Sequence, residues 1–274
     1  MTSNSTQQSE RTFGDLVRAW RSARRLSQLD LAGAADVSAR HVSFLETGRA
    51  NPSREMIERL AEALEIPRRE RNALLLSAGF APRFPKRSLD DPVLSPAERG
   101  VRFLLDSHDP YPAFVVDRLW NLVLSNEAHR VLLRWLLGYT PNEQNLLRLV
   151  VAPDLLKPFI RNWQTVTQFL MRRLEQHLAL PEADGSLEEL YRELVRLPGV
   201  DDARRSSVDL DPHGVLVPFE LEAHGRRLSW FSTLARFGSA VDITLEEILI
   251  ECLHPHGRRN GTNSSGDRCR GLGG

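Results

Sequence analysis

Cysteine and long apolar runs are scarce in this sequence of 274 residues. Its two cysteines, Cys252 and Cys269, are too few for a disulfide framework, and they form no CxxC pair. No apolar run approaches the roughly 18 residues that a membrane-spanning helix needs. The first ten residues, MTSNSTQQSE, are polar and hold no apolar segment of the kind found in secretory signals. These absences predict a cytoplasmic protein in a reducing compartment.

The signatures of common catalytic sites are also missing. The sequence contains no HExxH, no GxSxG and no GxxxxGK[ST], so hydrolase and NTPase functions have no support. Four residues near the end of the chain could supply zinc ligands: Cys252, His254, His256 and Cys269. His129 and His177 lie in helical segments and could ligate a haem. Such residues are more often incidental or structural, so we expect no enzyme, no metal and no cofactor.

Lysine is rare, and the positive charge is unevenly distributed. Arginine accounts for 34 of the 36 basic residues, and the net charge is zero. Residues 1–87 hold 15 basic against 10 acidic residues, whereas the remainder holds 21 against 26. A basic first part and an acidic second part favour a polyanionic partner for the first part alone, although a solvated basic surface would look the same.

Residues 12–79 divide into short segments with the apolar spacing of helices. The segments are 12–25, 27–35, 38–47, 52–65 and 67–79. Their recurring apolar residues are Phe13, Leu16, Val17, Trp20, Leu31, Ala32, Val42, Leu45, Ile57, Leu60, Ala61 and Leu64. Residues typical of helix ends separate them: Ser27, Ser38 and Ser53 as N-caps, Pro67 at a first helical position, and Gly48 and Gly79 beyond a last one. Helices this short must pack on one another, so we expect a compact all-α domain of five helices.

The rest of the chain mixes strand and helix patterns. A proline-rich stretch, 80–96, leads into a helix whose apolar residues are Val101, Leu104 and Leu105. Strand patterns occupy 113–117, 120–125, 215–222, 227–234 and 246–253, and helical patterns occupy 126–137, 141–151, 153–180 and 187–197, the last with a capping box of Ser186 and Glu189. Pro218 cannot donate to a ladder, which places the third strand at an edge. This order predicts an α+β domain with a five-stranded antiparallel sheet and helices on one face.

The domain boundaries follow from these patterns. We expect an all-α domain over residues 10–80, a linker and connecting helix over 81–109, a second domain over 110–255 and a disordered Gly-, Ser- and Arg-rich tail over 256–274.

The segment RLSQLDLAGAADVSARHVSFLETGRANPS joins two short capped helices by a tight turn, which is the helix-turn-helix geometry. If Val42 and Leu45 face inward, the opposite side of the second helix carries the base-reading candidates Ala39, Arg40, Ser43 and Phe44. The helix beginning at Gln28 presents amides to a phosphate. Arg49, Asn51 and Arg54, beyond the second helix, are further phosphate candidates.

Residues 12–79 resemble the Xre family of repressors, whose archetypes are the lambdoid phage repressors, through LSQLDLA, VS, LETG and NPS. The resemblance implies a lambda-repressor-like fold. It places phosphate contacts at Ser27, Gln28, Arg49 and Arg54 and base contacts at Ala39, Arg40, Ser43 and Phe44. It also implies a buried ion pair between Arg21 and Glu46. Asp36 stands where the family has a turn glycine, and Phe44 stands where a polar base reader is usual.

Residues 110–255 resemble the MmyB-like ligand-binding domain through PAFVVDRLWNLVLSNEA, NLLRLVVAPDLL and FSTLARFGSAVDITLEEILIECLHP. The resemblance implies a PAS-like fold and a hydrophobic, fatty-acid-like ligand. Five large aromatic residues are candidates for lining a ligand pocket: Trp120, Trp163, Phe169, Phe219 and Trp230. Core packing is the alternative for each of them, and the sequence leaves open which face of the sheet lines the pocket.

Together these features favour a one-component transcription regulator. We expect a homodimer on a pseudo-palindromic double-stranded DNA operator, with a small hydrophobic ligand and no membrane. The alternative is constitutive DNA binding, with the second domain as a platform for protein interaction or dimerisation.

Overall fold

The computed structural model describes residues 11–181, 185–206 and 216–256. Within them the contacts form two compact units: one runs to Pro85 and also takes in the segment that begins at Leu178, and the other begins at Lys86 and resumes at Gly185. The predicted tail, beyond His256, and the start of the predicted strand 215–222 lie outside the described residues.

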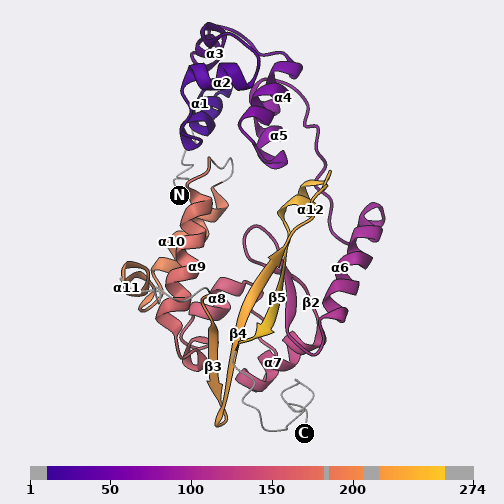
Figure 1. The fold of residues 1–274 in the computed structure, drawn as a ribbon, viewed down its shortest axis with the longest axis vertical. Coiled ribbons are helices and arrows are strands. Elements are labelled where there is room, and N and C mark those ends of the chain that lie inside the picture. The colour runs from indigo at the N-terminus through magenta and orange to yellow at the C-terminus, as the bar shows by residue number, and fades with distance from the viewer. Residues whose placement is uncertain (1–10, 182–184, 207–215, 257–274) are drawn as a thin grey trace, which may run out of the picture. The chain divides into compact units, whose positions relative to one another are not determined.

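The first unit is a bundle of short helices (Figure 1). Its elements are α1 (Phe13–Ala23), α2 (Gln28–Ala34), α3 (Ala39–Glu46), α4 (Arg54–Ala63) and α5 (Arg68–Ser77). Residues from different helices meet in one core, in which Val17, Leu31, Val42, Ile57 and Leu60 have no exposed side-chain surface. The predicted all-α domain of five helices is therefore confirmed.

Side chains at the helix ends explain where these helices begin. The Ser27 hydroxyl accepts a hydrogen bond from the amide of Asp30, and the Asp30 carboxylate accepts one from the Ser27 amide. Ser38 and Ser53 cap α3 and α4. Pro67, predicted as a first helical residue, is instead the N-cap of α5.

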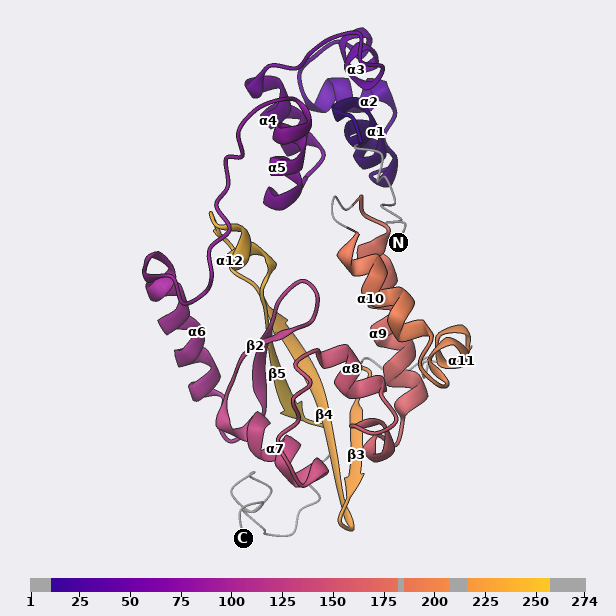
Figure 2. The same ribbon diagram turned by 180° about the vertical axis from the view of Figure 1, so that it is seen from behind.

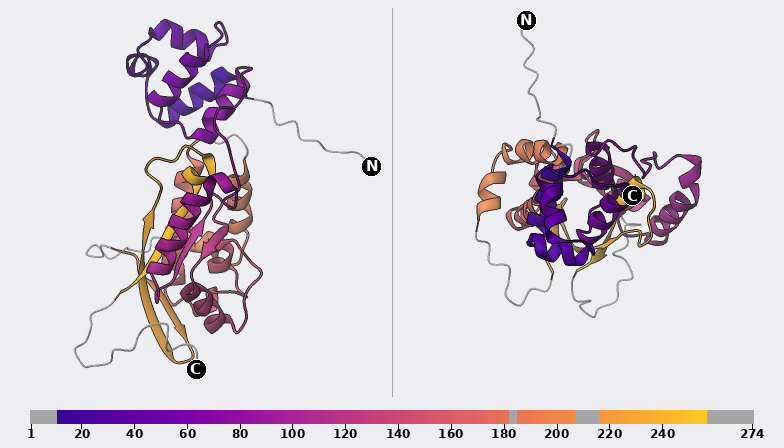
Figure 3. Two further views of the ribbon diagram at one scale, coloured as in Figure 1. Left: turned by 90° about the vertical axis from the view of Figure 1, so that its right-hand side faces the viewer. Right: turned by 90° about the horizontal axis from the view of Figure 1, so that it is seen from above.

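The second unit surrounds one sheet. Its elements are η1 (Pro92–Leu94), α6 (Ser95–Ser107), β1 (Ala113–Val116), β2 (Leu122–Ser125), α7 (Glu127–Leu137), α8 (Leu146–Val151), η2 (Lys157–Phe159), α9 (Trp163–Leu178), α10 (Ser186–Val195), α11 (Val200–Arg205), β3 (Phe219–Ala223), β4 (Arg226–Ala235), α12 (Ile243–Glu247) and β5 (Leu249–Pro255). The strand order is β2-β1-β5-β4-β3, every pair is antiparallel, and β3 lies at an edge as Pro218 predicted. The five-stranded, PAS-like sheet is confirmed. Its strands β3 and β4 form a long hairpin, which Figure 3 shows from the side.

Both faces of the sheet are covered, which corrects the expectation of helices on one face. Val115 and Ile250 are cross-strand partners and pack with Val101 of α6. Their neighbours Phe114 and Glu251, also partners, point to the opposite face because side chains alternate along a strand. Phe114 contacts α7 there. We call the side of Phe114 and Glu251 the inner face. In Figure 2, α6 lies beside β2, and α9 and α10 run side by side.

Several predicted boundaries are wrong for tertiary reasons. The helix expected from Pro141 begins only at Leu146, because Asn145 caps it and also donates a hydrogen bond to the carbonyl of Leu119 at 2.7 Å. The strand expected from residue 246 begins at Leu249, because Asp242 caps α12 just before it.

Two predicted side-chain roles also fail. The Ser186 hydroxyl accepts a hydrogen bond from Arg118 at 2.8 Å instead of capping α10, which Gly185 precedes in a left-handed conformation. Leu104 is 49% exposed, whereas Val101 and Leu105 of the same helix are buried.

Candidate DNA interface and ligand-binding domain

The α3 helix has one buried side and one open side. Val42 and Leu45 are buried in the helical core. Arg40 is exposed, and Ala39 and Ser43 are half-buried beside it. The turn between α2 and α3 places Asp36 in the left-handed region at φ 52°, which a short polar residue tolerates in place of glycine. The fold therefore presents the predicted base-reading side of α3 outward.

Phe44 supports Arg40. The two residues lie one turn apart, and the Arg40 guanidinium carbon is 5.1 Å from the centroid of the Phe44 ring. A cation over an aromatic face is attracted by about 0.5–1 kcal/mol at an exposed site. The aromatic residue that looked out of place among polar base readers thus holds the neighbouring arginine, a role visible only from their spacing on the helix.

An ion pair ties α1 to the end of α3. Arg21 donates from Nε to Glu46 Oε1 at 2.6 Å and from Nη2 to Oε2 at 3.0 Å, and Gln28 Nε2 donates to the same carboxylate at 2.8 Å. The Glu46 side chain is fully buried. Burial alone would raise the pKa of Glu46, but the hydrogen bonds from Arg21 and Gln28 and the charges of Arg21 and Arg18 lower it below its ordinary value. The carboxylate therefore stays ionised and ties α1 to the end of α3.

The phosphate candidates differ in how free their side chains are. Ser27 caps α2, and the Gln28 amide is committed to Glu46. Arg54 donates to the carbonyl of Ala81 at 3.2 Å and lies 5.5 Å from the Phe80 ring, so its guanidinium is held within the unit. Arg49 and Asn51 are exposed in the loop after α3.

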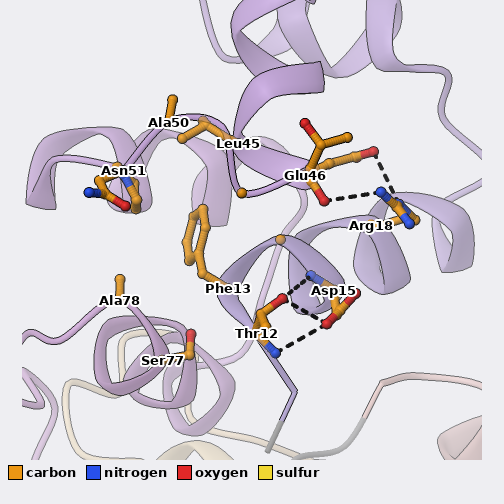
Figure 4. Close-up of a pocket in the computed structure, with 14 residues that line it drawn as sticks. Thr12, Phe13, Asp15, Arg18, Leu45, Glu46, Ala50, Asn51, Ser77 and Ala78 are labelled. Atoms are coloured by element: carbon orange, nitrogen blue, oxygen red, sulfur yellow. Dashed lines mark hydrogen bonds and ion pairs between the residues drawn. The ribbon is translucent and has the colours of Figure 1, made fainter.

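An open cleft of about 560 Å³ lies between the start of α1, the end of α3 and the end of α5 (Figure 4). Asp15 is engaged there by Thr12, and Arg18 donates to the carbonyl of Glu46 at 3.0 Å. The cleft walls are close because of Gly14: a Cβ there would lie 2.6 Å from the Glu46 carbonyl oxygen. These polar groups already have partners within the chain. The contacts across the cleft therefore hold α1 against α3.

The predicted pocket aromatics differ in burial and in the elements that carry them. Trp120 and Trp230 are buried, and Phe219 is the cross-strand partner of Trp230 on the inner face. Trp163 donates to the carbonyl of Val150 at 3.1 Å. Phe169 is 46% exposed and stands on α9 between buried Gln168 and half-buried Leu170, so its assignment to a pocket stays a prediction.

Arg173 on α9 was missed by the sequence analysis. Its guanidinium carbon lies 4.5 Å from the centroid of the Trp120 ring. Burial lowers the pKa of Arg173, while the charge of nearby Glu251 on the inner face raises it. In the sequence it is one of many arginines, and nothing local marks it as inward-facing.

Two of the histidines considered for haem or zinc contact other side chains of the protein. His129 is buried, its ring centroid lies 4.9 Å from that of the tilted Phe114 ring, and burial lowers its pKa to about 4. His254 contacts the Thr233 hydroxyl at 2.9 Å. Within the described residues, no group of three His, Cys, Asp or Glu side chains could hold a metal ion; Cys269 lies outside them.

Comparisons with curated proteins and solved structures return little similarity. None of the helices described is both long and apolar enough to span a bilayer. No curated protein matches the chain. One solved structure, titled "Structure of an RNA-binding Light-Oxygen-Voltage Receptor", aligns with 13% identity over 90% of this chain and 59% of that one, at a TM-score of 0.26. The present chain thus spans about three-fifths of that structure, and a similarity this low carries no functional inference.

Two family models match adjacent parts of the chain. Residues 12–74 match a helix-turn-helix domain, and residues 97–260 match the MmyB-like transcription regulator ligand binding domain. The second match alone covers more than half of the chain. The chain therefore carries a helix-turn-helix domain and a ligand-binding domain, and it belongs to the family of MmyB-like transcription regulators.

Proposed function

We propose that this regulator reads a guanine of its operator with Arg40 and responds to a hydrophobic, fatty-acid-like molecule in its second domain. The observation that carries the first half is the position of Arg40, exposed on α3 and stacked 5.1 Å over Phe44. A guanidinium can donate two hydrogen bonds to O6 and N7 of guanine in the major groove. Small Ala39 and Ser43 beside it allow the helix to approach the bases.

Backbone contacts would come from around the recognition helix. The exposed Arg49 is the most available cation for a phosphate, because Arg54 is held by Ala81 and Phe80. The amides at the start of α2, capped by Ser27, suit a second phosphate. A homodimer would place two α3 helices about one helical turn apart on a pseudo-palindrome.

The ligand would act by shifting a population. A molecule that binds two dimer geometries equally changes nothing, so the ligand must favour either the geometry that fits the operator or the one that does not. Buried Trp120 and Trp230 and the inner face of the sheet supply the apolar surroundings.

Substitution of Arg40 tests base reading. The operator is first selected from a random DNA pool, and gel shifts then compare operator with random DNA at fixed salt. Arg40→Ala should reduce the operator-to-random affinity ratio by about 5- to 150-fold, because a bidentate arginine–guanine contact contributes about 1–3 kcal/mol of discrimination.

Arg49→Ala is the matched control. This variant should weaken operator and random DNA alike and lower the slope of log affinity against log salt by about one. An unchanged operator-to-random ratio in Arg40→Ala would contradict the assignment of Arg40.

A second candidate is a constitutive DNA binder whose sheet domain docks another protein. Exposed apolar residues on α6 favour it, since Phe103 is 71% and Leu104 49% exposed. Native mass spectrometry of the purified chain separates the two. A reproducible bound hydrophobic mass supports the sensor, whereas an empty chain that ignores added lipids supports the platform.

A further inference from the structure

One side of α6 packs on the sheet, and the opposite side is an exposed apolar stripe. In Figure 1, α6 forms one edge of the second unit. Val101 and Leu105 are buried in the core, whereas Phe103 is 71% and Leu104 49% exposed. We define the outer seam of α6 as five exposed residues in line along the helix: Pro96, Gly100, Phe103, Leu104 and Ser107. Spacings of four, three and four residues are the pattern by which two helices pack lengthwise.

Gly100 leaves a recess in the outer seam beside Phe103. A Cβ placed on Gly100 would meet nothing within 4 Å, so no neighbour among the described residues requires a glycine there. Glycine within a helix is less favourable than alanine. A ring and a recess fit one another when two copies of α6 run in opposite directions, because Phe103 of each copy then lies opposite Gly100 of the other.

The charges beside the outer seam are also self-complementary. Arg99 and Asp106 are exposed and lie seven residues apart on the same flank. About a two-fold axis, antiparallel helices bring this flank of each copy together with the ends exchanged, so that Arg99 of one copy lies near Asp106 of the other. A parallel pair would instead place this flank against the uncharged flank of Leu104. Glu98 and Arg102, the other charged residues of α6, pair with each other at 2.8 Å.

We propose that the outer seam of α6 is a homodimer interface in which the α6 helices of two copies pack antiparallel, with Phe103 of each copy against Gly100 of the other. This inference rests on the homodimer of the proposed function and names the surface that forms it. A second copy fits the seam better than another protein does, because one surface supplies both the ring and the recess, and both charges. A two-fold pairing is also the closed arrangement that suits two recognition helices.

Substitutions in the outer seam test the interface. Sedimentation equilibrium of the purified full-length chain, without DNA, measures the dimer dissociation constant. Phe103→Asp should raise this constant by about 100-fold or more, because an aromatic anchor is lost on both sides of the two-fold axis. Gly100→Leu fills the recess and should raise the constant by about 10-fold. It also serves if Phe103→Asp does not fold, because leucine favours a helix more than glycine does.

Reversal of the flanking charges tests the antiparallel orientation. Arg99→Asp should raise the dissociation constant by about 10-fold, because like charges then meet at both ends of the pair. Asp106→Arg should do the same, and the double variant Arg99→Asp/Asp106→Arg should restore the native constant. Arg99 also donates to the Ser95 hydroxyl of its own helix, but its five N–H donors leave others for the second copy. Native constants in both single variants would overturn the antiparallel pairing.

Tyr139→Asp is the matched control, since Tyr139 follows α7 in the same unit and is 52% exposed; it should keep the native constant. A native constant in both Phe103→Asp and Gly100→Leu overturns this inference alone, because the dimer then forms through another surface. A native chain that stays monomeric at every concentration overturns the proposed homodimer and this inference with it. The base-reading role of Arg40 is unaffected by either result, because the gel shifts test it separately.

Discussion

Arg40 and Phe44 illustrate how one side chain can restrain another before it binds DNA. An arginine on a helix surface loses rotamer freedom when it binds a base, and that loss opposes binding. The Phe44 ring, 5.1 Å from the guanidinium carbon, restrains Arg40 before DNA is present. Phe44 thus contributes without reaching a base itself.

At the same scale, Glu46 makes the helical unit sensitive to acid. Its pKa is lower in the folded chain than the ordinary value of 4.5. Its contribution to stability is therefore complete above about pH 4.5 and is lost as the pH falls through the folded pKa. Glu46→Gln should cost about 3 kcal/mol near neutral pH, because Arg21 loses its buried partner, and should flatten the loss of stability on acidification.

Hydrogen exchange of peptides from α1 and α3, measured in urea between pH 7 and pH 3, gives the free energy of unfolding of this unit. Native and variant chains that lose stability in parallel below pH 4.5 would contradict the role of Glu46.

Among the elements, α1 and α3 owe their close approach to a glycine. A Cβ on Gly14 would lie 2.6 Å from the Glu46 carbonyl oxygen and 2.8 Å from that of Leu45. Gly14→Ala must push the two helices apart, so it should destabilise the helical unit by about 1–3 kcal/mol and weaken operator binding by displacing α3.

Gly33→Ala in α2 is the matched control, because nothing lies within 4 Å of the added Cβ. Alanine there should be neutral or stabilise by up to about 1 kcal/mol. Thermal unfolding of both variants provides the comparison, and equal midpoints would show that the α1–α3 contact tolerates a methyl group.

Across the whole molecule, the proposed sensor implies a reciprocal coupling between DNA and ligand. If dodecanoic acid changes the affinity for the operator by some factor, the operator must change the affinity for dodecanoic acid by the same factor. We expect a factor of about 5 to 150, the usual range of such couplings. Fluorescence anisotropy of labelled operator, with and without the acid, measures one side of the cycle, and calorimetry with and without operator measures the other. A factor of one on both sides would leave DNA binding constitutive.

The local features of this protein could be predicted from its sequence. Ser27, Ser38 and Ser53 cap their helices as expected, and the apolar spacing of α1 to α5 correctly identifies the buried residues of the helical core. Caps and helical periodicity act over three or four residues, so a single sequence contains them. For the same reason the outward side of α3, with Arg40 at its centre, was predictable from Val42 and Leu45.

Features that join distant segments could not be predicted in this way. The start of α8 depends on a hydrogen bond from Asn145 to Leu119, and the burial of Glu251 depends on the register of β5 against β1 and β4. Phe169 and Leu104 have the composition of core residues and are exposed, because the neighbouring elements leave their helix faces open.

The sequence by itself therefore determined the helical domain, the recognition helix and the five strands, since each is specified by nearby residues. Only the tertiary structure decided that helices cover both faces of the sheet and that Arg173 stacks on Trp120 beside Glu251. The physical reason is that strand register, helix docking and the burial of a charge depend on which distant surfaces exclude water together, and no local pattern records that pairing.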